Sequence, residues 1–461
     1  MKYKSIQTVL NIYIGIYIGH DKEACYNENW LCKIQKLKNC MHVWKSRKLS
    51  LNGKITIIKS MAISIFIYVF SVLIVPQNIV KEINKILYNF LWNKKDRIKR
   101  NTLILKKTEG GLKMIDVASK IESLKAAWIV RLYKFKKYGN VLESILLKHG
   151  INLKILIDGG LGESKILTNL LYIPIFYAEC IASFNKCKTG TKSKTLSTYD
   201  FLTQPIWCNG LFTSKNKPIF LTSWAKSGIL WVKDIFNKTG HFLTELELLR
   251  KLDYKSNWMV EYMIVRKIFL NHPTSIQTNL KMGQYINMIS SQPLFYTGNK
   301  KYKLEDLTSK LLYDLLIIKK GERSYMEKAW EKAFKIKITN NMWESIYLHR
   351  VHQMPNILAN FIYKLIHNLV LCRNVLKKWK RTTSEFCPIC REIEPVKHIY
   401  FECIKVKALW NKISTFMKIY ITSKIILGYE NTNLHGLFRN LLFSVILYGI
   451  FNIWLDGIEK A

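Results

Sequence analysis

The sequence predicts a mainly α-helical protein (α with minor β). Apolar residues recur at intervals of three and four along much of the chain, which is the spacing of one helix face. Stretches with the β-branched and aromatic composition of strands are short, and the clearest is VLNIYIGIYI at 9–18. Hydrophobic residues make up 49% of the 461 residues, so the chain can bury a sizeable core in about two to four domains.

The N-terminal third begins with a predicted strand pair, with Gly15 as a bend point, and continues as basic amphipathic helices. The first helix is expected to end near Arg47, and SLNG at 50–53 forms a turn or a helix cap. The next helix is expected from about Gly53 to Val75, because Pro76 cannot continue it. The apolar stripe of the first helix consists of Trp30, Ile34, Leu37, Met41 and Trp44.

Two further helices are expected, over QNIVKEINKILYNFLW at 77–92 and over 116–135. Between them lie the polar loop NKKDRIKR at 93–100, with five positive charges and one negative charge, and a turn at EGG, residues 109–111.

The middle of the chain gives a weaker signal. Residues 151–220 show no clear period, and KTGTKSKTLST at 188–198 has the composition of a flexible linker or loop. Residues 216–236 suggest a short strand, a helix and another strand, and helical patterns return after them. From 325 to the end most of the chain is predicted to be helical, except at 387–403.

The charge of the chain is strongly positive. Lys and Arg number 72 against 32 Asp and Glu, a formal charge of +40, and residues 28–150 alone hold 25 basic and 7 acidic side chains. Such an excess repels itself unless a polyanion is the usual partner, so nucleic acid is the first candidate and an anionic membrane the second. A merely solvated face, in a protein from an AT-rich genome, stays open for any single cluster.

The cysteines and the apolar segments argue against a secreted or membrane protein. Ten cysteines are ordinary usage, and most show no disulfide-framework spacing, so a nuclear or cytoplasmic, not secreted, location is expected. The uncharged stretches 60–80 and 440–455 are short for a bilayer and are interpreted as buried helices. The start of the chain lacks the cleavage site of a signal peptide.

One short segment has the composition of a metal site. CPICREIEPVKHIYFEC places Cys387, Cys390, His398 and Cys403 within 17 residues. Structural zinc takes four nitrogen or sulfur ligands, and a Cys-x2-Cys turn brings two sulfurs to one side. The gap of seven residues between Cys390 and His398 differs from the four of the retroviral knuckle. On spacing alone, a buried cysteine pair with an unrelated histidine remains an alternative.

The residues around this segment resemble a known family. CPIC…HIYFECIKVKALW resembles the zinc-binding segment near the C-terminus of LINE-type (non-LTR) retrotransposon reverse transcriptases. WKSRKLSLNGKITIIKSMAIS at 44–64 resembles the thumb signature of the same family, and INKILYNFLW at 83–92 and EGGLKMIDV at 109–117 follow in the family's order. The resemblance covers roughly residues 9–455, with a diffuse middle.

The resemblance implies four segments. Residues 1–26 would be a remnant of the palm-end β-hairpin, 27–150 a basic helical thumb-like domain, 151–324 a connecting mixed α/β region, and 325–461 a helical C-terminal region with a knuckle-like zinc module at 387–403. The family's catalytic aspartates hold magnesium in a palm, and this sequence contains no Asp-Asp pair. The expectation is therefore that the chain starts just after that active site and is inactive alone.

The resemblance also implies partners and binding residues. We expect one structural zinc, magnesium only in the absent palm, and binding of RNA and RNA–DNA template-primer but of no membrane. The missing palm and fingers portion of the same element is a further candidate partner. The zinc module would contact RNA or only staple the fold. A degenerate transposon remnant, or a zinc-stapled interaction protein without a nucleic-acid role, is the alternative. The predicted nucleic-acid contacts are Trp44, Lys45, Arg47, Lys48, Lys54, Lys94, Lys95, Arg97, Lys99, Arg100, Lys397, Lys405 and Lys407.

Overall fold

The structure of the protein is a computed structural model. The backbone is described for residues 11–13, 15–93, 95–134, 140–188, 201–237, 241–252, 258–270, 295–297, 300–370, 372–378, 380, 382–418, 420–428 and 436–459. Most of the predicted linker, the start of the first predicted strand, and residues 253–257 and 271–292 of the helical pattern expected at 243–292 lie outside these residues.

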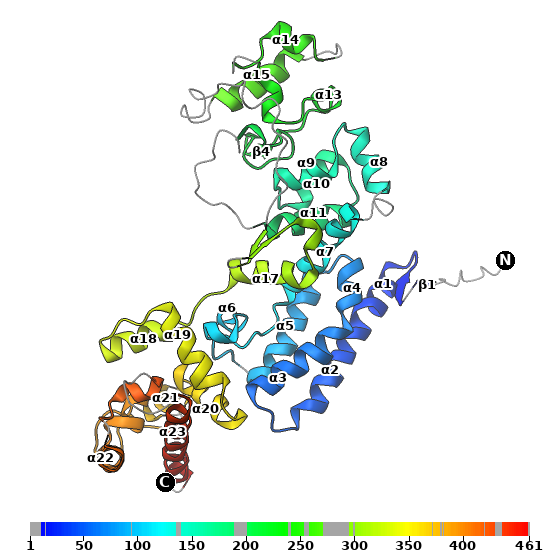
Figure 1. Cartoon of the computed structure of the whole chain (residues 1–461). Helices are drawn as coiled ribbons and strands as arrows, with labels where there is room; N and C mark the ends of the chain where they lie inside the picture. The colour runs from blue at the N-terminus through cyan, green and yellow to red at the C-terminus, as the bar shows by residue number, and fades with distance from the viewer. Residues whose placement is uncertain are drawn as a thin grey trace, which may run out of the picture. The chain divides into compact units, whose positions relative to one another are not determined.

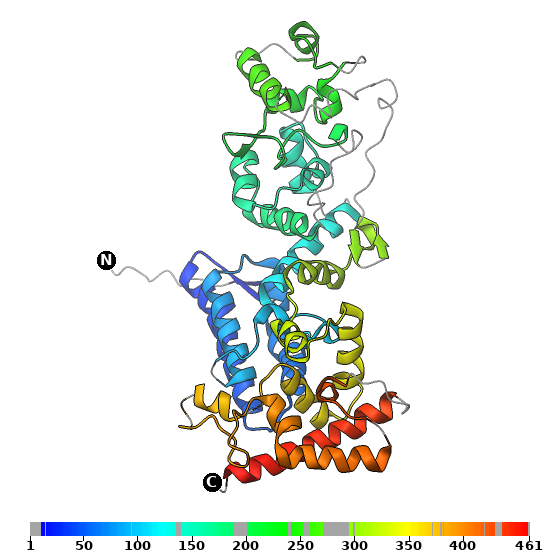
Figure 2. The same cartoon turned by 90° about the vertical axis from the view of Figure 1, so that its left-hand side faces the viewer.

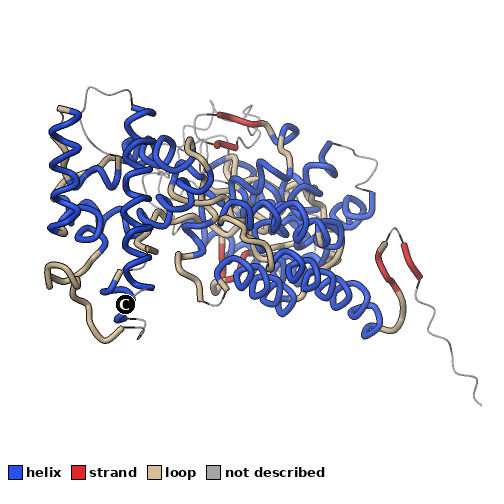
Figure 3. The backbone as a smooth tube through the Cα atoms, turned by 90° about the horizontal axis from the view of Figure 1, so that it is seen from below, coloured by secondary structure: helices blue, strands red, loops and turns tan. Residues whose placement is uncertain are grey.

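The described residues are mainly helical, as predicted, and Figure 3 shows how little of the chain is strand. The three sheets found among them each contain two antiparallel strands. The pairs are β1 Asn11–Tyr13 with β2 Ile16–Ile18, β3 Thr213–Ser214 with β4 Lys217–Pro218, and β5 Phe295–Thr297 with β6 Lys300–Tyr302. The predicted N-terminal strand pair is therefore confirmed over its described part, with Gly15 at a φ of +79° in its turn.

The chain divides into two compact units. The first consists of Met1–Ile65, Lys81–Asp116 and Lys320–Ala461, and the second of Phe66–Val80 and Val117–Lys319. Figure 1 gives their helices by label and colour. The basic N-terminal helices and the C-terminal Cys/His segment thus belong to one unit. The four segments expected from the sequence remain a prediction.

The N-terminal part of the first unit contains the basic helices. They are α1 Lys22–Tyr26, the π-helical turn η1 Asn27–Leu31, α2 Cys32–Lys45, α3 Leu51–Ile57, η2 Ile58–Ala62, η3 Ile63–Ile65, α5 Gln77–Trp92, α6 Arg100–Leu103 and η4 Lys107–Glu109. The first four residues of α5 fall in the second unit. The predicted stripe of α2 is buried at Ile34, Leu37 and Met41. Ser50 caps α3 by accepting a hydrogen bond from the Gly53 amide at 3.1 Å, which confirms the predicted cap.

The sequence predicted one continuous helix from Gly53 to Val75, and this prediction is wrong because the structure divides the stretch into shorter helical segments. The π-helical turn η2 and the 3-10 turn η3 separate α3 from α4, Ile67–Val72. Side chains along this stretch bond back to the helix carbonyls, Thr56 to Asn52 at 3.0 Å and Ser60 to Thr56 at 2.8 Å. Such back-bonding bends helices, and it accounts for the change of pitch here.

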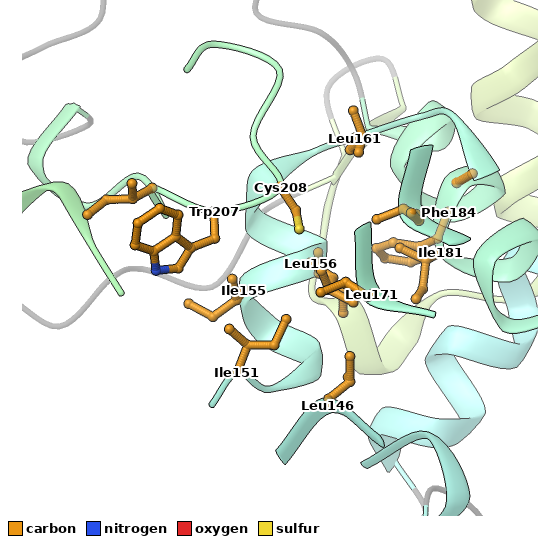
Figure 4. Close-up of a cluster of buried hydrophobic side chains, with 14 of the residues drawn as sticks. Leu146, Ile151, Ile155, Leu156, Leu161, Leu171, Ile181, Phe184, Trp207 and Cys208 are labelled. Atoms are coloured by element: carbon orange, nitrogen blue, oxygen red, sulfur yellow. The ribbon is translucent and has the colours of Figure 1, made fainter. Parts of the chain in front are cut away.

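The second unit is built on two long helices that pack along each other, α7 Val117–Lys134 and α11 Ile175–Cys187. Three shorter helices, α8 Asn140–Lys148, α9 Leu153–Gly159 and α10 Ser164–Leu171, complete its core. Figure 4 shows part of this core, with Leu156, Phe184 and Trp207 among the buried side chains. Much of 153–187 is therefore helical where the sequence showed no clear period.

Further helical elements of the second unit follow along the chain. They are α13 Thr222–Lys226, the 3-10 turn η6 Val232–Ile235, α14 Glu245–Leu249, α15 Trp258–Leu270, η8 Leu304–Asp306 and α17 Ser309–Lys320, whose last residue falls in the first unit. The second strand predicted within 216–236 is wrong, because η6 occupies that stretch. The Asp234 carboxylate accepts hydrogen bonds from the Leu230 and Trp231 amides at 2.9 and 2.7 Å, which closes the turn.

The C-terminal part of the first unit is a set of helices around α20. Its elements are α18 Tyr325–Phe334, α19 Asn340–Ile346, η9 Tyr347–His352, α20 Asn356–Ile366, α21 Arg373–Lys378, η10 His398–Glu402, α22 Ile404–Met417, η11 Ser423–Leu427 and α23 Gly436–Glu459. The last helix, red in Figure 2, packs against α20, η9 and η10. Arg350 is fully buried among them and donates to the Asn440 and Ile425 carbonyls at 3.1 and 2.9 Å.

The EGG turn joins the basic helices to this C-terminal region. The Gly110 carbonyl accepts hydrogen bonds from Tyr363 Oη at 3.2 Å and from His367 Nε2 at 3.1 Å. The Lys107 carbonyl lies 2.9 Å from His352 Nε2. Partners more than 240 residues away in the sequence therefore hold this turn, and they fix residues 107–110 to η9 and α20.

Because His367 is buried in this contact, we expect the protein to lose stability in acid. Burial lowers the pKa of His367 from 6.5 to about 4. The unfolded chain takes up a proton on this histidine below pH ~6.5, whereas the folded protein does so only near its lower pKa. The free energy of unfolding should thus fall as the pH drops through this window, by about 2 kcal/mol between pH 7 and pH 5 from this residue. Urea unfolding at the two pH values measures the loss.

The variant His367→Gln should lose less stability over the same pH range, because it keeps an amide donor for Gly110 and has no group that titrates there. His42→Gln is the matched control, since His42 is exposed on α2. An equal pH dependence of the wild type and His367→Gln would contradict this account.

The two uncharged stretches at 60–80 and 440–455 both contain helical segments, as predicted. Among the described residues, no helix is both long enough and apolar enough to cross a membrane. No disulfide bond joins any of the ten cysteines, all of which lie in the described part of the chain.

Candidate metal centre

The Cys387–Cys390 pair lies in a tight reversal of the chain. Phe386 and Ile393 form an antiparallel bridge on either side of it. The Cys387 amide donates to the Glu392 carbonyl at 2.7 Å, and the Arg391 amide donates to the Cys387 carbonyl at 2.9 Å. Arg391 closes the reversal at a φ of +59°, a conformation that most side chains avoid. The turn brings both sulfurs to one side, as the Cys-x2-Cys spacing predicts.

The other two residues come from the start of a helical stretch. His398 begins the π-helical turn η10, and Cys403 is the cap residue between η10 and α22. The Cys403 amide donates to the His398 carbonyl at 2.9 Å, which fixes the separation of the two side chains. Trp410 Nε1 donates to the Tyr400 carbonyl at 2.8 Å and holds α22 against the same turn.

The four side chains converge on one point. Their ligand atoms all lie within 4.8 Å of one another. The Cys387 and Cys403 sulfurs are 4.0 Å apart, and Cys390 Sγ is 3.0 Å from His398 Nε2. Zinc at about 2.3 Å from each sulfur of a tetrahedron requires sulfurs about 3.8 Å apart. Three thiols and one imidazole at these distances fit a structural zinc ion in donor type, number and spacing.

The sequence could not identify what orients the histidine. Nδ1 of His398 lies 3.5 Å from Glu392 Oε2, while Nε2 faces the cysteines. A carboxylate on the second ring nitrogen sets the tautomer that leaves the first nitrogen free to bind metal. Glu392 is therefore a positioning residue, and only its place in the gap between the ligands could have drawn attention to it. Glu394 is fully buried and accepts a hydrogen bond from the Arg373 amide at 3.0 Å, which holds the turn to α21.

The thiols lie in an apolar setting. Burial raises the pKa of Cys387 to about 11, although the Cys390 and Ile389 amides point at its sulfur and partly offset the effect. The thiol is therefore protonated at neutral pH until a cation displaces the proton. His398 and Cys403 are likewise buried, and Cys390 is half-buried. The four protein side chains together supply all the ligands of a tetrahedral site.

The predicted nucleic-acid contacts near the N-terminal basic helices fall on one unit. Lys45, Arg47 and Lys48 are exposed at the end of α2 and in the loop that follows it. The Arg47 guanidinium lies 4.6 Å from the centre of the half-buried Trp44 ring. Lys54 is half-buried instead, and its ammonium donates to the Leu91 carbonyl at 3.2 Å.

The remaining predicted contacts differ in their surroundings. Three are engaged in ion pairs: Lys99 with Glu322 at 3.5 Å, Arg100 with Asp96 at 2.8 Å, and Lys397 with Glu402 at 2.7 Å. Four are exposed: Lys95, Arg97, Lys405 and Lys407. Lys94 lies outside the described residues. Lys45, Lys48 and Lys95 have no carboxylate within ion-pair distance in the described part of the chain.

A family comparison agrees with this geometry. Residues 308–410 match the family described as zinc-binding in reverse transcriptase. All four converging residues lie inside the matched segment. The chain therefore carries a zinc-binding domain of the kind found in reverse transcriptases, and the match supports a protein related to that class of enzymes.

Proposed function

We propose that this chain is the nucleic-acid-binding C-terminal part of a LINE-type (non-LTR) retrotransposon reverse transcriptase. The observation that carries the proposal is the match of residues 308–410 to the reverse-transcriptase zinc-binding family, with a converged Cys3His set inside it. The thumb-like signature at 44–64 lies in the same compact unit as that segment's Cys3His set. The proposed partners are RNA and RNA–DNA template-primer.

In this proposal the ion is structural. Four protein ligands leave no open coordination position for a substrate or a water molecule. When bound, zinc would link the reversal at 387–393 to the start of α22. Other residues support the ligands: Glu392 orients the imidazole of His398, and backbone amides of the reversal face the Cys387 sulfur. The module thereby stiffens the region from which Lys405 and Lys407 project.

The basic helices would hold the phosphate backbone of a template-primer. Lys45, Lys48 and Lys95 are exposed, belong to one unit and have no acidic partner among the described residues. Contacts of this kind position a duplex without reading its sequence, and each releases counterions when it forms. Affinity should therefore fall steeply with salt and depend little on sequence.

The test is the salt dependence of binding. Full-length wild-type protein should bind an RNA–DNA primer duplex, and the logarithm of its affinity should fall linearly with the logarithm of the salt concentration. The triple variant Lys45→Gln, Lys48→Gln, Lys95→Gln should reduce that slope by about 0.9 for each phosphate that it no longer neutralises. Fluorescence anisotropy with a labelled duplex at several salt concentrations measures both slopes.

The matched control removes the same charge from the other unit. Lys165, Lys217 and Lys226 are exposed there, and their triple change to Gln should leave the slope close to that of the wild type. Absent or salt-independent binding by the wild-type protein would refute the proposed function.

A further inference from the structure

An open pocket lies inside the first unit, between the loop before α3 and the helices α20 and α23. Its volume is about 870 Å³, within the range of roughly 300–1,000 Å³ typical of small-molecule sites. Asn356, Asn360 and Lys364 line it from one face of α20, because they recur every fourth residue. The loop side contributes Lys48 and Arg97.

All the charged side chains that line the pocket are basic. Lys48, Arg97 and Lys364 are among its lining residues, and none of the described lining residues is acidic. Burial and the neighbouring Arg97 lower the pKa of Lys364. Burial also lowers the pKa of Lys54, and Lys364, Arg97 and Lys45 add to this shift. The repulsion between neighbouring cations decreases when an anion binds between them.

Another part of the pocket wall is aromatic. Tyr448 and Phe451 come from α23, and both are half-buried. Their ring centres lie 5.4 and 5.2 Å from that of the buried Phe361 on α20, so the core fixes their position. A rigid aromatic wall beside a cationic wall suits a ligand that has both a phosphate and a flat ring.

We propose that this pocket binds one nucleotide of an unpaired RNA strand. Lys48, Arg97 and Lys364 would take its phosphate, and Tyr448 and Phe451 would pack against its base. A paired base cannot reach the aromatic wall, because both its faces are covered in the stack; the pocket therefore selects single strands. The inference rests on the proposed function, and it adds a site that joins the thumb-like loop to the segment matched by the zinc-binding family.

The experiment tests the basic and the aromatic residues of the pocket separately. The probes are a fluorescein-labelled oligouridylate and a strand of the same length that has phosphates but no bases. Lys364→Gln should weaken the binding of both probes and lower the salt slope by about 0.7. Phe451→Leu keeps the apolar packing but removes the flat face, so it should weaken oligouridylate binding roughly tenfold and leave the abasic strand unchanged.

Controls distinguish the possible failures. Lys328→Gln removes an exposed charge from α18, outside the pocket. If the wild type binds oligouridylate but Lys364→Gln and Phe451→Leu behave like Lys328→Gln, the pocket is overturned while the proposed function stands. If the wild type binds no nucleic acid, both fail. Should melting curves show that Lys364→Gln is misfolded, Arg97→Gln replaces it, because Arg97 also lines the pocket, is exposed in the loop 93–100 and is not part of the triple variant that tests the proposed function.

Discussion

Replacing one ligand of the Cys3His set is expected to remove the metal and unfold the C-terminal part of the first unit. Wild-type protein expressed with zinc should carry one ion per chain, and Cys387→Ser or His398→Ala should carry close to none. In small zinc domains the binding free energy is on the order of 10 kcal/mol at neutral pH, and it acts as folding free energy. Metal analysis and thermal melting measure the two effects.

The control for this prediction is Cys32→Ser. Cys32 is an exposed free cysteine in α2, far from the cluster in sequence, and its loss should change neither zinc content nor melting temperature. Glu392→Gln should have an intermediate effect, because it weakens the orientation of the imidazole but keeps all four ligands. Wild-type protein that stays metal-free after expression in zinc would rule out the site.

Adding a single methyl group at Gly111 is the second change with a large expected effect. A Cβ atom there would lie 2.2 Å from the Leu105 carbonyl oxygen and 2.7 Å from that of Thr102. Both neighbours are backbone and cannot move aside, because Leu105 also accepts a hydrogen bond from the Lys113 amide at 2.9 Å. Gly111→Ala should therefore lower the free energy of unfolding by more than about 3 kcal/mol.

Chemical denaturation of the zinc-loaded protein, followed by tryptophan fluorescence, measures this loss. Gly210→Ala is the matched control, because a Cβ at Gly210 would meet no atom within 4 Å. Equal stability of the two variants would show that the turn relaxes at low cost and that residues 102–113 are not held as described.

Sequence periodicity predicted the helices that have one buried face. The stripe of α2 is an example, since Ile34, Leu37 and Met41 are buried and the lysines between them are exposed. It could not predict α11, where residues 180–185 are all buried in succession, so that no polar face marks the turns. It also misread residues 232–235, because the short apolar run at 229–232 fits a strand and a helix equally well, and the Asp234 carboxylate then closes a 3-10 turn.

The metal ligands of the candidate site could be predicted from the sequence, but the residues that position the ligands and hold the surrounding turns could not. Residue type and spacing made Cys387, Cys390, His398 and Cys403 candidates, and the resemblance of the flanking residues favoured them over a cysteine pair with an unrelated histidine; in the structure these four side chains converge. The Glu392 contact depends on a side-chain orientation. The clamp on Gly110 depends on residues 253 and 257 positions away, a separation at which periodicity carries no information.

The discontinuity of the first unit has a consequence for how the protein is made. Its basic helices leave the ribosome before residues 117–319, and the residues that clamp Gly110 leave it after them. At ~5–20 residues per second, these roughly 200 residues take about 10–40 s to synthesise. During that interval the nascent chain presents a strongly basic, half-finished domain next to ribosomal and messenger RNA. The order of synthesis thus makes RNA the first polyanion that the unfinished protein meets.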